Sequence, residues 1–352
     1  MPYELTGKLA KLKPYDPVEG EYKIRLDANE SFCNINEALG GKLAAEISKI
    51  SLNRYPDPLA GDVIKAFGGF YGIPEKYITA GNGSDELISV ITSCFLETGD
   101  TILTVSPDFS MYAFYGSLYE LKVETIQKED DLTINVAKLI EYANRNNVKA
   151  IIFSNPCNPT SLGITREEVI RLIENVFCLV IVDEAYMDFW TESVLDAVSQ
   201  YDNLIVLKTC SKALGLAAIR LGFAVAGETV TNALRAAKSP YNTDTISQTI
   251  GRVILSEKQL LKDTIDRIVA SRNDLYAKLR ELSARTSKLR YVYEPKTNFV
   301  FIRTDLAEEL FEGMLKRSIA IRFMGGYLRI TAGTAEENEA VVSAIAEILN
   351  IE

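Results

Sequence analysis

Three short apolar runs share one design, and this repetition limits the fold more than any other feature of the 352-residue chain. Residues 150–153, 178–182 and 204–207 are short and apolar, and each run leads at once into polar residues. Helical patterns, for example over 166–175, separate them. Short apolar strands that alternate with helices indicate a mostly parallel sheet with both faces covered. We therefore expect an α/β fold whose large domain has a mostly parallel central sheet covered by helices.

The polar residues that follow these runs carry the candidate chemistry. Asn158 comes after the first run, Asp183 after the second and Lys212 after the third. In parallel sheets a ligand lies beyond the carboxyl ends of the strands, so these three side chains are expected at one edge. With Tyr186 and Arg220 they form the set of side chains that pyridoxal phosphate (PLP) requires.

Each member of this set has an expected role. Lys212 is predicted to form a Schiff base with the cofactor aldehyde and later to move a proton as a general acid and base. Asp183, at the end of a buried run, is expected to pair with the pyridine nitrogen, because a buried carboxylate needs a partner. Asn158 and Tyr186 are expected to hydrogen-bond the ring oxygen. Lys212, Asp183 and Tyr186 are the predicted catalytic residues.

The cofactor phosphate needs hydroxyl groups, a guanidinium and backbone N–H groups. A helix predicted over 85–97 follows a glycine-rich turn, which places N–H groups at a helix N-terminus. The predicted phosphate ligands are Thr209, Ser211 and Arg220, together with the backbone of Gly83, Ser84 and Asp85. Phe109 is the candidate for stacking on the pyridine ring.

A smaller α+β domain is predicted towards the C-terminus. Strands are expected over 290–292, 298–303, 319–323 and 326–331, with helices over 305–317 and 335–350. The predicted large domain spans 30–240, and the second unit combines 1–29 as an arm with 241–352. Arg329 lies in the last of these strands among apolar residues. An arginine there needs an anion, and we expect the substrate carboxylate.

Composition narrows the classes of function. The chain has no histidine, which excludes Ser-His-Asp and Cys-His catalysis and His-dependent metal sites, and we expect no metal. The net charge of −10 offers no basic surface for nucleic acid. Five scattered cysteines without a CxxC pair are expected to be reduced thiols. With no apolar run near ~18 residues and no signal-peptide pattern, we expect a cytoplasmic protein that does not contact the membrane.

The sequence resembles the fold-type I PLP-dependent aminotransferases of class I/II, and most closely their histidinol-phosphate aminotransferase branch. The likeness extends from about residue 12 to residue 350. The matching stretches are 27–30, 54–58, 81–86, 155–160, 183–186, 211–213 and 328–334. Ser161 departs from the family motif, which has glycine at that position, so a differently shaped turn is expected there.

The resemblance implies a homodimer with its active sites at the interface. It implies that Tyr55 reaches the phosphate of the neighbouring subunit's cofactor, and that Tyr15, in the N-terminal arm, covers the substrate. It also implies that Arg322 binds the substrate phosphate, and that Asn158 and Arg329 contact the substrate.

The expected activity is a histidinol-phosphate:2-oxoglutarate aminotransferase of histidine biosynthesis, working by a ping-pong exchange through pyridoxamine phosphate. Its substrates would be a phosphorylated amino alcohol or amino acid and a 2-oxo acid. Two alternatives within the same fold are a broader aromatic or acidic amino-acid aminotransferase and a threonine-phosphate decarboxylase. The decarboxylase family typically carries a His-Gly-Gly stretch near the N-terminus, and this chain has no histidine. A non-catalytic PLP-fold sensor domain is a fourth possibility, although no basic extension accompanies it here.

Overall fold

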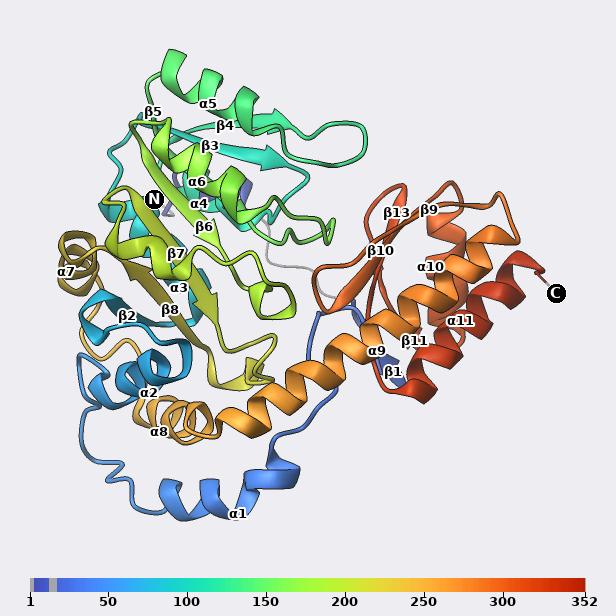
Figure 1. The fold of residues 1–352 in the computed structure, drawn as a ribbon, viewed down its shortest axis with the longest axis horizontal. Coiled ribbons are helices and arrows are strands. Elements are labelled where there is room, and N and C mark those ends of the chain that lie inside the picture. The colour runs from blue at the N-terminus through green and yellow to red at the C-terminus, as the bar shows by residue number, and fades with distance from the viewer. Residues whose placement is uncertain (1–2, 13–17, 352) are drawn as a thin grey trace.

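The computed structural model describes residues 3–12 and 18–351, and its largest sheet has seven strands in the order β2-β8-β7-β6-β5-β3-β4 (Figure 1). The neighbouring pairs from β7 to β4 are parallel, whereas β8 is antiparallel to both of its neighbours. The predicted mostly parallel sheet is confirmed. The strands are β2 (Ile78–Asn82), β3 (Thr101–Ser106), β4 (Lys122–Gln127), β5 (Val148–Ser154), β6 (Leu179–Asp183), β7 (Leu204–Thr209) and β8 (Leu221–Ala226).

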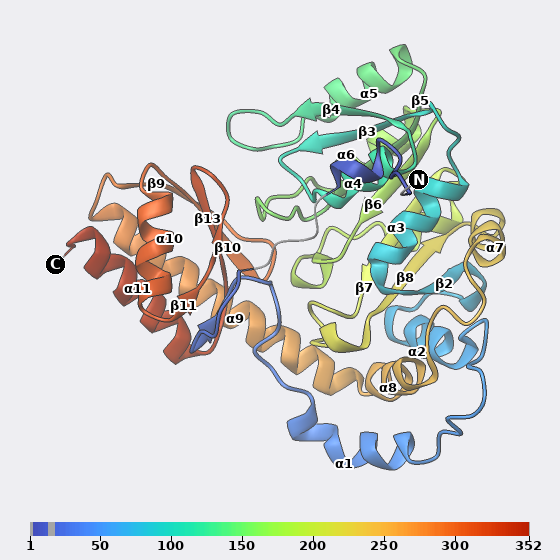
Figure 2. The same cartoon turned by 180° about the vertical axis from the view of Figure 1, so that it is seen from behind.

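Apolar residues on both faces of this sheet make it the middle of three layers. Along β5, Ile151 and Phe153 pack into one core cluster, while Ala150 and Ile152 pack into another on the opposite face. Alternate side chains of a strand point to opposite faces, so a continuous apolar strand requires helices on both sides. One face is covered by α2 (Gly61–Tyr71), α5 (Val136–Arg145), α6 (Arg166–Glu174) and α8 (Thr245–Leu255). The other is covered by α3 (Gly83–Cys94), α4 (Met111–Leu118) and α7 (Glu228–Ala237) (Figure 2).

The antiparallel strand β8 brings its first residues to the carboxyl edge of the parallel strands. Gly222 pairs with Thr209 of β7 and with Gly81 of β2. A Cβ atom on Gly222 would lie 2.2 Å from the backbone nitrogen of Ser84 at the start of α3. Since the backbone cannot yield at such a distance, only glycine allows β8 to pass this close to the N-terminus of α3.

A second body is built on an antiparallel sheet with the order β12-β13-β10-β9. The long helix α9 (Lys258–Ala284) runs from the large sheet to this body (Figure 1), where α10 (Ala307–Lys316) and α11 (Ala335–Leu349) join it on one face. The strands are β9 (Leu289–Tyr293), β10 (Phe299–Thr304), β12 (Arg322–Phe323) and β13 (Tyr327–Thr331). Near it, β1 (Ile24–Arg25) pairs in parallel with β11 (Ile319–Ala320), and α1 (Asn36–Ile47) follows along the chain.

The single strand predicted over 319–323 is wrong. Residues 319–320 belong to the pair with β1, and residues 322–323 pair with β13. Ile321 lies between the two and is fully buried in the small core, so the chain changes sheets there. The strands β2 and β4 were not predicted. The division of the chain at residue 240 stays a prediction, and α8 packs against the large sheet beyond that point.

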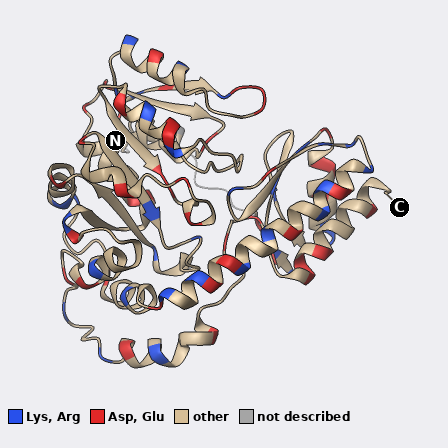
Figure 3. Cartoon of the chain, in the orientation of Figure 1, with Lys and Arg blue, Asp and Glu red and all other residues tan. Residues whose placement is uncertain are grey.

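Within the described residues no helix combines the length and apolarity that a membrane span requires. Basic and acidic residues are interspersed along α9 and over the other helices (Figure 3).

Candidate active site

The carboxyl ends of β5, β6 and β7 bring the predicted cofactor residues to one edge of the large sheet. Asp183 is the last residue of β6 and Thr209 the last of β7, and Asn158 lies in the turn after β5. Ser154 pairs in register with Asp183, so these strands end at the same level. The structure brings the predicted residues together, and their roles stay predictions.

Lys212 follows β7 in a partly buried loop. Its Nζ donates a hydrogen bond to the carbonyl oxygen of Ala28 at 3.0 Å. Burial lowers the pKa of Lys212 from 10.5 to about 8, and the nearby Arg329 and Arg220 guanidinium groups act in the same direction. An amine with a pKa near neutrality is partly deprotonated and can act as a nucleophile.

Asp183 is 4% exposed and accepts hydrogen bonds from two neutral donors. The Tyr112 hydroxyl donates to Oδ2 at 2.8 Å, and the Ala185 N–H donates to Oδ1 at 3.0 Å. Burial raises the pKa of Asp183 from 3.8 to about 6, and these two hydrogen bonds partly oppose that shift. A carboxylate in this position is stabilised by a cation placed beside it.

The predicted phosphate ligands converge where α3 begins. Ser211 Oγ lies 3.0 Å from Thr209 Oγ1 and accepts from Arg220 Nη1 at 3.4 Å. Gly83, the first residue of α3, has φ +81°, and a Cβ atom there would lie 2.9 Å from Arg220 Nη2. A guanidinium, two hydroxyls and the N–H groups of a helix N-terminus, including those of Ser84 and Asp85, therefore share one small region. This arrangement suits an anion.

Arg329 joins the two sheets through Asn158. Its Nη1 donates to Asn158 Oδ1 at 2.6 Å, and its Nη2 donates to the carbonyl oxygen of Asp27 at 2.6 Å. Because a guanidinium only donates, the carbonyl end of the Asn158 side chain must face Arg329. The Asn158 NH₂ group is then directed away from Arg329, as hydrogen bonding to a ring oxygen requires.

Three site residues were not assigned from the sequence, although 27–30 was noted as a matching stretch. Ala28 supplies its carbonyl to Lys212, and Asn29 donates from Nδ2 to the Tyr186 hydroxyl at 2.8 Å. Tyr112, which holds Asp183, stands three residues after Phe109, and the two rings meet edge to face at 5.5 Å. Phe109 precedes α4 (Met111–Leu118), so no helical pattern in the sequence marked Tyr112 as a partner of Asp183.

Two predicted residues lie apart from this cluster or cannot be placed. Tyr55 is 81% exposed in the loop between α1 and α2, where it stacks on Tyr241 with 4.6 Å between ring centroids. Tyr15 lies outside the described residues.

Arg322 is half-buried and is the cross-strand neighbour of Arg329. Directly opposed residues of antiparallel strands share one face of the sheet, so both arginines belong to the face that carries Arg329 to Asn158.

Ser161 keeps a backbone conformation that favours glycine. Its φ is +64°, and the residue is fully buried. Its hydroxyl lies 2.5 Å from Thr297 Oγ1 and accepts from the N–H groups of Lys296 and Thr297. The left-handed conformation costs an L-residue roughly 1–2 kcal/mol, and these hydrogen bonds offset it while joining the turn to the segment before β10.

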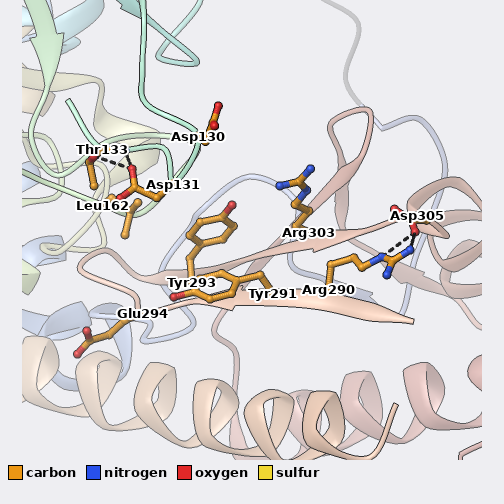
Figure 4. A pocket seen from close by; sticks show the side chains of 10 residues that line it. All are labelled: Asp130, Asp131, Thr133, Leu162, Arg290, Tyr291, Tyr293, Glu294, Arg303 and Asp305. Carbon is orange, nitrogen blue, oxygen red and sulfur yellow. Dashed lines mark hydrogen bonds and ion pairs between the residues drawn. The ribbon is translucent and has the colours of Figure 1, made fainter. Parts of the chain in front are cut away.

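A cavity of about 710 Å³ opens farther along the same face of the small sheet (Figure 4). The aromatic residues Tyr293, Phe301 and Tyr327, packed with Leu132 and Leu162, lie beside it. Of the predicted site residues that the structure describes, none lines this cavity. The lining residues are Asp130, Asp131, Thr133, Leu162, Arg290, Tyr291, Tyr293, Glu294, Arg303 and Asp305.

The cluster at the sheet edge fits PLP in each of its donor groups. Asp183 suits a cationic ring nitrogen, Lys212 suits an aldehyde, and Arg220 with the start of α3 suits a phosphate. Asn158 and Tyr186 suit the ring oxygen as hydrogen-bonding groups. Opposite pKa shifts of a carboxyl and an amine in one site are typical of a functional centre.

Comparison with known proteins agrees with this chemistry. Residues 24–345 match the model of the family described as aminotransferase class I and II. The chain is 42% identical over 338 residues to histidinol-phosphate aminotransferase of Clostridium novyi (strain NT), covering 95% of this chain and 94% of that protein. It is 38% identical over 346 residues to the protein of that name from Clostridium kluyveri, covering 97% of each.

Among solved structures, the fold is similar to histidinol-phosphate aminotransferase from Sinorhizobium meliloti in complex with pyridoxal-5'-phosphate. The TM-score is 0.88 at 20% identity, and the match covers 98% of this chain and 97% of that one. This likeness supports the fold.

Replacing Asp183 by asparagine should stabilise the cofactor-free protein above pH 6. In the fold this carboxyl has a pKa of about 6, against 3.8 as its ordinary value, so folding binds a proton and stability falls as pH rises from about 4 to 6. Asparagine does not titrate. The unfolding free energy of Asp183→Asn relative to the parent should therefore rise by ~2 kcal/mol between pH 4 and 7.5.

Denaturant unfolding of the cofactor-free proteins at several pH values measures this difference. Asp131→Asn is the control, because Thr133 lowers the pKa of Asp131 and the pH trend should be small and of opposite sign. A pH-independent difference for Asp183→Asn would contradict a neutral-range titration of this carboxyl.

Proposed function

The chain belongs to the aminotransferase class I and II family and is a PLP-dependent transaminase, and we propose that its amino donor is histidinol phosphate and its acceptor 2-oxoglutarate. Relatives named histidinol-phosphate aminotransferase that align over nearly the whole chain carry this proposal. The products would be imidazole acetol phosphate and glutamate, exchanged in two half-reactions at one site.

When bound, PLP supplies an aldehyde that takes up the amino group and a ring that withdraws electrons from the reacting carbon. The residues of this chain orient and tune that chemistry. Lys212 anchors the cofactor covalently and, when released, carries the proton between the substrate carbon and the cofactor. Asp183 keeps the ring nitrogen protonated, because its buried carboxylate is stabilised by that positive charge. Asn158 and Tyr186 hold the ring oxygen.

The arginine pair on the small sheet supports a substrate with anions at one or both ends. Arg329 is fixed by Asn158 and by the carbonyl of Asp27, which suits a carboxylate at the reacting carbon. Arg322 stands opposite on β12 and suits a second anion. Histidinol phosphate has a phosphate and no carboxylate, whereas glutamate has two carboxylates. One arginine must therefore serve both a phosphate and a side-chain carboxylate, and Arg322 is the candidate.

A homodimer is part of the proposal. Large apolar side chains are exposed in the loop between α1 and α2, in the segment before α8 and in the first turn of α8, and exposed apolar surface marks association sites. They are Leu52, Tyr55, Leu59, Tyr241 and Ile246, of which Tyr55 and Tyr241 stack on each other. We also propose a cytoplasmic location, in keeping with five cysteines that are all unpaired thiols.

The donor is tested by mixing the PLP-loaded enzyme with one amino compound at a time and recording the spectrum of the bound cofactor. Histidinol phosphate should convert the cofactor to its amine form far faster than phenylalanine or aspartate. Faster conversion by phenylalanine or aspartate would instead favour the broader amino-acid aminotransferase. Release of carbon dioxide from threonine phosphate would favour the decarboxylase.

Substitutions of Arg329 and of Arg322 should affect the two half-reactions differently. Arg329→Ala should harm mainly the glutamate half-reaction, because histidinol phosphate has no carboxylate. Arg322→Ala should harm both half-reactions. The activation free energy derived from kcat/KM should rise by roughly 2–5 kcal/mol in each, because a desolvated charge pair is lost. Single-turnover rates with each donor measure both effects. Equal and small effects of Arg322→Ala on phosphorylated and unphosphorylated donors would argue against histidinol phosphate.

A shared active site predicts complementation between two inactive variants. Tyr55→Ala and Lys212→Ala chains should each be inactive alone, because each lacks one half of every site. Each mixed dimer would contain one site with both residues intact and one site that lacks both. A mixed dimer should therefore have about half of the activity of a parental dimer. Mixed dimers that form and stay inactive would show that Tyr55 does not act across the interface.

A further inference from the structure

A buried chain of hydrogen bonds ends at the hydroxyl of Tyr186. The backbone N–H of Asn29 donates to Thr331 Oγ1 at 3.1 Å, and Thr331 Oγ1 donates to Asn29 Oδ1 at 3.2 Å. Asn29 Nδ2 then donates to the Tyr186 hydroxyl at 2.8 Å. Asn29 is 1% exposed, Thr331 2% and Tyr186 5%, so water does not compete for these groups.

The bonds in this chain all run in one direction. A backbone N–H can only donate, so Thr331 Oγ1 accepts from Asn29 N–H. A hydroxyl also has one proton of its own, and Thr331 directs that proton at Asn29 Oδ1. Since Oδ1 faces Thr331, the NH₂ end of the same amide faces Tyr186, and an NH₂ group only donates. The Tyr186 oxygen is therefore an acceptor towards Asn29, and its own proton points elsewhere.

Among the described residues, no protein group accepts a hydrogen bond from the Tyr186 hydroxyl, so its proton can be donated to a bound cofactor. The charged and titratable groups near it include Arg329, Asp183, Cys157 and Lys212, whose Nζ lies 5.9 Å from the Tyr186 ring centroid. Arg329 only donates, and Lys212 donates to the Ala28 carbonyl. Asp183 accepts from Tyr112 and Ala185. The Phe299 ring packs edge to face against the Tyr186 ring at 5.5 Å.

We propose that Asn29 is a positioning residue that makes Tyr186 a hydrogen-bond donor to the ring oxygen of bound PLP. Thr331 acts through Asn29 by fixing which end of the amide faces Tyr186. This inference rests on the proposed roles of Lys212 and Tyr186. A donated proton stabilises negative charge on the ring oxygen, so it lowers the pKa at which the visible absorption of the Lys212-bound cofactor changes.

Asn29→Asp reverses the direction at almost constant shape, because a carboxylate accepts and cannot donate. The Tyr186 proton should then turn towards the introduced carboxylate, and the ring oxygen should lose its donor. The absorption pKa should rise by about one unit, towards that of Tyr186→Phe. This is measured by pH titration of the spectrum without any substrate, so it does not depend on which donor the enzyme uses.

A new negative charge near the cofactor also raises its pKa, and a double-mutant cycle separates the two causes. If charge alone acts, Asn29→Asp shifts the pKa equally in the parent chain and in the Tyr186→Phe variant. If Asn29 sets the direction of the Tyr186 proton, most of the shift disappears when Tyr186→Phe is already present. Equal shifts in both backgrounds would overturn the proposal.

Thr331 offers a test without a change of charge, which also decides the matter if Asn29→Asp does not fold. Thr331→Val removes the proton that orients the amide, so the pKa should rise, while Thr331→Ser keeps the hydroxyl and should leave it unchanged. Identical pKa values for the Val and Ser variants would contradict the relay.

Two controls test whether the pKa change is specific to Asn29 and whether the cofactor is bound to Lys212. Asn338→Asp changes another fully buried asparagine, which bonds Ser271 and Gly333 instead, and should not move the absorption pKa. Borohydride reduction followed by peptide mapping should place the pyridoxyl group on Lys212 in the parent chain. A label on a different lysine would reject the cofactor assignment itself, which distinguishes that failure from a failure of the Asn29 relay.

Discussion

The segment from Asp27 to Asn29 is the point on which the arrangement of the site depends. Its three consecutive residues bond Arg329, Lys212 and Tyr186, which come from β13, the loop after β7 and the turn after β6. Two of the three contacts are made by backbone carbonyls, so they depend on the path of the chain and not on side-chain identity. That path is fixed by Leu26, which packs in the small core and accepts from the Thr331 N–H. The small sheet thereby sets the geometry of groups that belong to the large one.

Burial shifts the pKa of Asp183 and of Lys212 in opposite directions for one reason. In both cases low polarity disfavours the charged form, so the carboxyl is drawn upward to about 6 and the amine downward to about 8. Each shift costs folding free energy near neutral pH in the protein alone. In the roles proposed for these residues, PLP would relieve both costs, since its ring nitrogen would carry the cation that Asp183 needs and its aldehyde would take up the uncharged amine. We therefore expect the site to be less stable by itself than with its cofactor, as where function opposes stability.

The sequence predicted the site residues whose positions follow from where they lie in single strands. Asp183 and Thr209 end buried strands, and parallel strands place their carboxyl ends together, so the cofactor edge followed from apolar runs and their polar ends. Tyr112 was missed because its contact with Asp183 depends on how α4 packs on the sheet. Asn29 was missed because its partner lies 157 residues away. The split of residues 319–323 between two sheets was missed because both strands have two residues and no local pattern marks the change. The path of the N-terminal segment beside β11 decides it.

The two arginines of the small sheet differ in burial and in their place in the sheet, and we propose that this difference bears on substrate choice. Arg329 lies in a central strand, is 8% exposed and has two hydrogen bonds of 2.6 Å to Asn158 and Asp27. Its guanidinium therefore has one position, which suits the constant part of a substrate. Arg322 lies on a two-residue strand at the sheet edge and is half-buried. A phosphate and a side-chain carboxylate lie at different distances from the reacting carbon. We propose that selection of the far anion belongs to this edge strand and the loops around it, while the cofactor edge stays the same for every donor.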